Sequence, residues 1–141
     1  MSINDTIIES AKRVYKELGP GHNEKIYHKA LAYELSCLGF ILDSEMNIIV
    51  KYTDSKGFQH NLESERIDLF LKQHNIILEL KAIQKNIQGQ EICQIKKYFN
   101  ELNKLKILVS HGIIINFTQP NSKDIPSDIE YKIIVNELAM H

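Results

Sequence analysis

The chain has 141 residues, of which 43% are hydrophobic and 25% are charged, and its formal net charge at pH 7 is −1. This length is typical of one domain that buries a core without disulfide or metal crosslinks, so we predict a single domain over residues 1–141. No window approaches the about 18 consecutive apolar residues of a membrane span. The first residues also lack the basic and apolar segments of a secretion signal. We therefore expect a cytoplasmic protein with no membrane partner.

The lysines are unevenly distributed along the chain. Residues 81–106 contain six lysines and two acidic residues, whereas residues 1–80 contain nine basic and twelve acidic residues. The near-zero net charge gives no overall indication of nucleic-acid binding, but a local strip of lysines near residues 96–106 can follow a phosphate backbone. An ordinary solvated helix face would show the same composition.

Cys37 and Cys93 are the only cysteines, and each lies inside a helical pattern without histidines at ligand spacing. Free cysteines are among the most buried residue types. We expect two buried free thiols rather than a disulfide or a zinc site.

Two helices are predicted before any strand. Apolar residues recur at helical spacing over residues 4–18, and Gly19 and Pro20 end that helix. The second helix begins after Gly21, where Asn23 can cap its first turn, and Gly39 is suited to its C-terminal cap.

A run of β-rich segments follows, and we interpret it as an antiparallel meander. Its predicted strands cover residues 46–53, 58–64, 65–71 and 76–83, with a turn at Asp54–Gly57. A third helix is predicted over residues 88–103 and a strand over 112–117. Residues 131–135 fit either a last strand or part of a helix.

The segments 65–71 and 76–83 divide their side chains between two faces of the sheet. One face carries only apolar residues, namely Ile67, Leu69, Leu71, Ile76, Leu78 and Leu80. The other face carries four charged residues, namely Arg66, Asp68, Glu79 and Lys81. Burying the apolar face restricts the pairing register, because a slip of one residue would turn one strand over.

The length of the turn decides which charged residues face each other. If Lys72–Asn75 is a four-residue loop, Asp68 lies directly opposite Glu79, and like charges at opposed positions are unfavourable unless something compensates them. Magnesium is a natural compensator, because it prefers oxygen ligands and commonly takes one or two carboxylates. Lys81 would then stabilise negative charge or orient water on the same face. A two-residue loop would instead pair Asp68 with Lys81 in an ordinary surface salt bridge.

The spacing Asp68-x10-Glu79-Leu80-Lys81 resembles the D-x(n)-E-x-K core of the PD-(D/E)XK nuclease superfamily. Upstream, the segment Gly21–Tyr27 resembles the signature of the bacterial GxxExxY proteins, a branch of that superfamily. Further matches follow in the same order, at Arg66-Ile67-Asp68, Glu79-Leu80-Lys81-Ala82, Gln94-x3-Tyr98 and Asn116-Phe117. The stretch between Tyr98 and Asn116 is several residues longer than the family pattern.

The resemblance implies a restriction-endonuclease-like α/β fold of αβββαβ type, with a mixed central sheet flanked by helices. It implies that Glu24, Asp68 and Glu79 bind Mg²⁺, or alternatively Mn²⁺, and that Lys81 assists the hydrolytic water. At helical spacing Glu24 shares a face with Tyr27, so we expect it to point inward. An acid in the first turn of a helix can also simply be stabilised by the helix dipole.

The resemblance also implies that Gln94 belongs to this predicted catalytic set, and Tyr98 and Arg66 accompany it. Gln94 resembles the polar helix residue that often lies near the metal site in the superfamily. Tyr98 either borders the core or joins the site. Arg66 either contacts phosphate or pairs with Glu79.

The leading hypothesis is a metal-dependent nuclease that hydrolyses phosphodiester bonds of nucleic acid, with DNA as the expected substrate. The alternative is a non-catalytic nucleic-acid-binding or assembly module that retains the nuclease fold, because fold does not establish function. A third hypothesis is a non-enzymatic homodimer or the partner of an unknown protein, as in toxin–antitoxin pairs. Only the apolar N-terminal helix favours this third hypothesis, and core packing explains that helix more simply.

Overall fold

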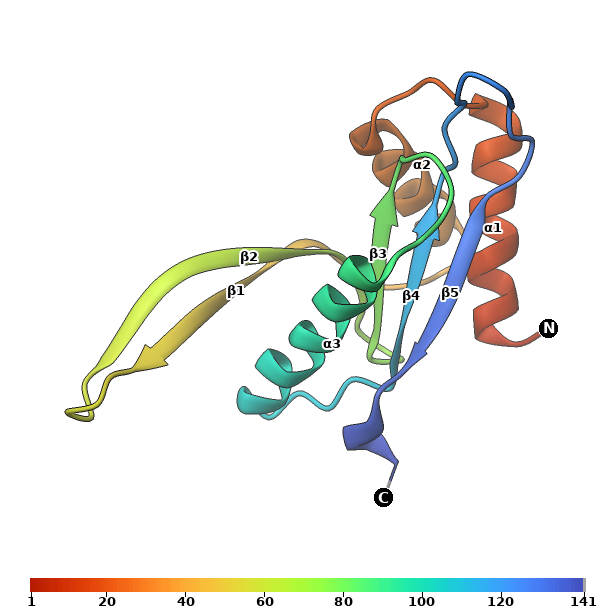
Figure 1. The fold of residues 1–141 in the computed structure, drawn as a ribbon. Coiled ribbons are helices and arrows are strands. Elements are labelled where there is room, and N and C mark those ends of the chain that lie inside the picture. The colour runs from red at the N-terminus through yellow and green to blue at the C-terminus, as the bar shows by residue number, and fades with distance from the viewer. Residues whose placement is uncertain (141) are drawn as a thin grey trace.

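A five-stranded mixed sheet forms the centre of the fold, with helices on both of its faces (Figure 1). The computed structural model describes residues 1–140. In chain order the elements are α1 (Ile3–Leu18), α2 (Glu24–Cys37), β1 (Leu42–Thr53), β2 (Gln59–Leu71), β3 (Ile76–Lys81), α3 (Gly89–Lys104), β4 (His111–Asn116), β5 (Glu130–Val135) and a 3-10 helix η1 (Glu137–Ala139). The series from α2 to β4 is the predicted αβββαβ order, so the α/β fold class is confirmed.

The strands follow the spatial order β1-β2-β3-β4-β5. Only β3 and β4 are parallel, and α3 makes the crossover between them. The antiparallel pairs β1–β2 and β2–β3 agree with the predicted meander, and β5 is also antiparallel to β4. Residues 130–135 form a strand, which decides the assignment that the sequence left open.

Two apolar clusters hold the layers together. The helices α1 and α2 cover one face of the sheet, where their side chains pack on residues such as Leu69 and Leu78. The helix α3 covers the opposite face, where Ile95 and Phe99 pack on residues such as Ile77. A Cβ atom on Gly112 would lie 2.3 Å from Cδ1 of Ile95, so glycine is what lets α3 approach β4 this closely.

The predicted helix ends are confirmed. Gly19 ends α1 with a left-handed φ of 71°, which glycine adopts without a Cβ penalty. Asn23 caps α2 by accepting a hydrogen bond from the Ile26 backbone amide at 3.2 Å. Gly39 follows the end of α2 with a φ of 92°. These caps fix where α2 begins, and thus where Glu24 lies.

The predicted strands 58–64 and 65–71 are wrong as separate elements, because β2 is one strand of 13 residues. Its outer half pairs only with β1, and the two strands form a long hairpin that projects beyond the rest of the sheet (Figure 1). We call residues 49–64 the arm. Almost all of its side chains are exposed, so no alternation of buried positions marked the continuous strand in the sequence.

Cys37 and Cys93 are free, as predicted, but the prediction that they are buried is wrong. Cys37 is the last residue of α2, beside the exposed Leu38, and Cys93 lies on an exposed side of α3. Within residues 1–140, the helices are too short or too polar to cross a membrane.

Candidate active site

The register of β2 and β3 places Asp68 and Glu79 opposite each other. Leu71 pairs with Ile76 and Leu69 pairs with Leu78, which leaves Lys72–Asn75 as a four-residue turn. The left-handed φ of 53° at Asn75 closes this turn. The four-residue loop is therefore confirmed, and the alternative that paired Asp68 with Lys81 is wrong.

The backbone pairing of β2 with β3 ends at Leu69 and Leu78, and beyond it the carboxylates of Asp68 and Glu79 bond to the backbone of the opposite strand. Oε1 of Glu79 accepts a hydrogen bond from the Asp68 amide at 3.2 Å, and Oδ2 of Asp68 accepts one from the Leu80 amide at 2.8 Å. Each carboxylate is thus held by the backbone of the opposite strand. Within residues 1–140, no hydrogen bond occupies the second oxygen of either group, Oδ1 of Asp68 or Oε2 of Glu79.

The face that carries this pair is covered rather than open to solvent. Phe70 and Ile77, which share a face with Asp68 and Glu79, pack against α3. Ile67, which was predicted to lie with Leu69, belongs to this same cluster under α3. Buried and exposed side chains therefore do not alternate strictly around Asp68. The neighbouring strand β1 is irregular at this point, where Glu45 has a φ of 56°. The pair therefore lies at the edge of the α3 layer.

Burial makes the charged forms of both carboxylates unfavourable. Glu79 is only 3% exposed, and burial, followed by the negative charge of Asp68, raises its pKa well above the usual range. Burial also raises the pKa of Asp68, against the opposing effects of the Leu80 amide, His28 and Lys81. Two carboxyl groups that resist ionisation side by side would ionise more readily beside a cation.

Glu24 lies in the first turn of α2, near the same pair. Burial raises its pKa, the charge of Asp68 raises it further, and Lys81 acts in the opposite direction. The segment Gly21–Tyr27 supports this placement through Tyr27, whose hydroxyl donates to the Gly19 carbonyl at 2.7 Å. The Tyr27 ring stacks on Phe117 with a centroid separation of 4.6 Å, which anchors the start of α2 to the end of β4.

Lys81 is the last residue of β3, and α3 supplies its hydrogen-bond partner. Nζ of Lys81 donates to Oε1 of Gln94 at 3.4 Å, and Nε2 of Gln94 donates to the Tyr98 hydroxyl at 3.0 Å. Tyr98 in turn donates to the Arg66 carbonyl at 3.0 Å. No ion pair of Lys81 is found in the described part of the chain, so its ammonium group is directed by a neutral amide.

Tyr98 has both of the roles that the sequence left open, because it belongs to the core and also contacts the site. Its ring is 2% exposed and belongs to the core under α3, while its hydroxyl holds Gln94. Burial, followed by the nearby charge of Glu79, raises the pKa of Tyr98, so the phenol stays protonated and remains a hydrogen-bond donor.

Two ionisable residues beside Asp68 were not predicted. His28 is 8% exposed, and its Nε2 lies 2.8 Å from Oγ of Ser44. Glu45 lies on β1 across from Asp68, because its neighbours Ser44 and Met46 pair with Leu69 and Ile67. Arg66 pairs with Glu45 at 3.1 Å, so the alternative in which it pairs with Glu79 is wrong, and the alternative of a phosphate contact stays a prediction. His28 follows Glu24 by four residues, and this spacing on one helix face could have indicated it.

The donor chemistry fits a hard divalent cation. Asp68 and Glu79 offer oxygen atoms without a hydrogen-bond partner, and magnesium commonly takes one or two carboxylates. Within residues 1–140, no three Asp, Glu, His or Cys side chains are close enough together to form a ready metal site. The structure thus pairs Asp68 with Glu79 and leaves Glu24 nearby, outside a three-ligand cluster.

The predicted lysine strip is partly neutralised. Lys97 pairs with Glu65 at 2.6 Å, and Lys104 pairs with Glu101 at 3.2 Å. These two lysines are therefore less available to a phosphate backbone than the sequence suggested.

Comparisons with known proteins agree with this fold. The family model described as the PD-(D/E)XK nuclease superfamily matches residues 1–126. Among solved structures, the crystal structure of SSO0001 is similar, with a TM-score of 0.51 and 13% sequence identity over 96% of this chain and 79% of that chain. At that identity the likeness supports the fold alone. No curated protein matches this chain.

Proposed function

This chain belongs to the PD-(D/E)XK nuclease superfamily, and from that membership we propose that it hydrolyses phosphodiester bonds of nucleic acid, with DNA as substrate and Mg²⁺ or Mn²⁺ as cofactor. We also propose that it belongs to the GxxExxY branch. The observation that carries the proposal is the pair of Asp68 and Glu79, each held by the backbone of the opposite strand, near Lys81, whose ammonium group donates to Gln94.

Each residue of the site has a proposed role. Asp68 and Glu79 would hold the cation through their free oxygens, with Glu24 as the third carboxylate. The cation, when bound, polarises a phosphoryl oxygen and lowers the pKa of water. Lys81 donates a hydrogen bond to the attacking water or to a phosphate oxygen, where negative charge develops. Gln94 orients Lys81 and is a positioning residue, because its contact runs through the ammonium group.

Cleavage of end-labelled DNA in the presence of Mg²⁺ or Mn²⁺ tests this proposal. We expect Asp68→Asn to remove detectable cleavage, because the amide cannot replace a carboxylate ligand but can still accept from the Leu80 amide. We expect Lys81→Met to slow cleavage by about a hundredfold or more. Asp54→Asn and Lys51→Met on the arm are matched controls that should cleave normally. Normal cleavage by either site variant would remove the assignment.

A second candidate function is nucleic-acid binding or assembly without turnover. The observation that favours it is the near-complete burial of Glu79, whose raised pKa favours the neutral form that binds metal poorly. Such a module would bind labelled DNA, yet leave it intact with either cation. A homodimer or an unknown protein partner stays a prediction.

A further inference from the structure

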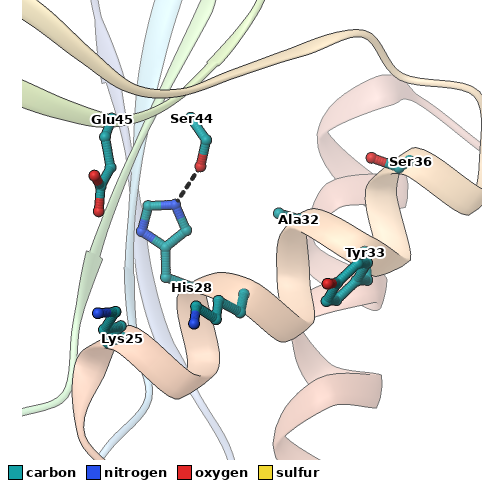
Figure 2. Close-up of a pocket in the computed structure, with 8 residues that line it drawn as sticks. Lys25, His28, Ala32, Tyr33, Ser36, Ser44 and Glu45 are labelled. Atoms are coloured by element: carbon teal, nitrogen blue, oxygen red, sulfur yellow. Dashed lines mark hydrogen bonds between the residues drawn. The ribbon is translucent and has the colours of Figure 1, made fainter.

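A groove between α2 and the start of β1 reaches Glu45, the neighbour of Asp68 in the sheet. Its volume is about 550 Å³. The residues that matter here are Lys25, Lys29 and Tyr33 on α2, together with His28, Ser44 and Glu45. Figure 2 shows Lys25 and Glu45 at one end of the groove, Tyr33 and Ser36 at the other, and His28 between them, directed at Ser44.

Three α2 residues along this groove form a regular row. Lys25, Lys29 and Tyr33 are spaced by four residues, so they share one side of the helix and succeed each other at about 6 Å along its axis. Tyr33 is 75% exposed, which leaves its ring free to stack. The row therefore combines two cationic side chains with an open aromatic face.

The groove carries positive charge that the protein does not neutralise. Within residues 1–140, neither Lys25 nor Lys29 forms an ion pair, whereas the one acidic residue of the groove, Glu45, pairs with Arg66 at 3.1 Å. The groove thus complements an anionic chain.

The position of the groove relates it to the site. Glu45 lies beside Asp68, because Ser44 pairs with Leu69 and Met46 pairs with Ile67. A second groove of about 440 Å³ is lined by Lys81, Gln94 and Lys97, among others. Each groove thus contains lysine and one residue near the carboxylate pair, Glu45 in the first groove and Lys81 in the second.

We propose that the α2 groove binds a single-stranded segment of the nucleic acid next to the bond that is cut. Lys25 and Lys29 contact neighbouring phosphates, and Tyr33 stacks on a base. Stacking on a protein side chain requires a base whose face is open, as it is in a single strand. This inference deepens the proposed function and rests on it for the identity of the ligand.

The test measures binding without cleavage. A fluorescent single-stranded DNA of about 12 nucleotides is titrated with the full chain in EDTA, and its anisotropy is recorded at several salt concentrations. We expect Tyr33→Ala to weaken binding by about 5- to 100-fold. We expect the double variant Lys25→Gln/Lys29→Gln to weaken binding and to reduce the salt slope by about 1.4, since each phosphate contact contributes about 0.7.

Matched controls come from elsewhere in the chain. Lys12→Gln/Lys16→Gln removes a pair of lysines with the same spacing on α1, and Tyr52→Ala removes an exposed tyrosine from the arm. Both should bind as the wild type does. The wild type should also bind the single strand more tightly than the same sequence in a blunt duplex.

The outcomes separate this inference from the proposed function. Wild-type affinity in both groove variants, no binding of single strands, or a preference for the duplex would overturn the groove assignment, even if DNA is cleaved normally. Loss of binding in both groove variants, with normal binding in the controls, supports the assignment even if no cation induces cleavage.

Discussion

The two halves of β2 differ in burial and in the number of strands with which they pair. The inner half, residues 67–71, lies between β1 and β3 and is almost entirely buried, whereas the outer half, residues 59–64, pairs with β1 alone and is exposed. Asp68 stands near the boundary, one residue beyond the last backbone pairing with β3. The candidate site therefore forms where the backbone ladder between β2 and β3 ends, because side chains there can make hydrogen bonds that a continuous ladder would use.

The largest expected difference between the two regions is in stability. Leu78→Ala removes a fully buried side chain opposite Leu69, and we expect it to lower the free energy of unfolding by about 2–5 kcal/mol. Leu62→Ala changes an arm residue that is 59% exposed, and we expect a change within about 0.5 kcal/mol. Urea denaturation measures both. Equal losses would show that the arm is as tightly packed as the inner sheet.

A smaller effect is the pH dependence of the free energy of unfolding, which has opposite signs at Glu79 in the site and at Asp54 in the arm. Because the pKa of Glu79 is raised, the folded chain binds more protons than the unfolded chain at pH values above the ordinary carboxyl pKa of 4.5. The stability from protonated Glu79 is therefore present at low pH and is lost as the pH rises through the folded pKa. In the arm, the hydrogen bond from His60 lowers the pKa of Asp54, so its contribution is lost as the pH falls.

Glu79→Gln tests this sign directly. The amide oxygen can still accept from the Asp68 amide, and no charge is buried. Without divalent cations, we expect the variant to be more stable than the wild type at neutral pH by on the order of 1 kcal/mol. The advantage should vanish at acidic pH, as measured by urea denaturation across a pH series. A variant that is less stable at neutral pH would contradict the account of Glu79 as a group that burial keeps from ionising.

The sequence restricted the register of the site to two pairings, because the apolar residues of both strands had to share one face. A four-residue turn places Asp68 opposite Glu79 and a two-residue turn places it opposite Lys81, and only the structure shows that the turn has four residues. The helix caps were predictable, since Gly19 and Asn23 act within one turn of chain. Such features depend on neighbours in the sequence, and the sequence contains them in full.

The missed features depend on contacts between distant elements. The arm was divided into two strands because solvent on both sides removes the alternation that marks a strand. Glu45 and His28 were missed as neighbours of Asp68, because β1 and α2 approach it only in the folded chain. Cys93 was placed in the core from a general tendency, while the apolar stripe that starts at Ile95 leaves it on an exposed side of α3.

Calorimetric titration of the purified chain with Mg²⁺ and with Mn²⁺, without nucleic acid, tests whether Asp68 and Glu79 form a cation site. If Asp68 and Glu79 form the cation site, the wild type binds the cation, and Asp68→Asn and Glu79→Gln each abolish or strongly weaken that binding, while Asp54→Asn leaves it unchanged. Cation binding that persists at wild-type affinity in both site variants would contradict the account.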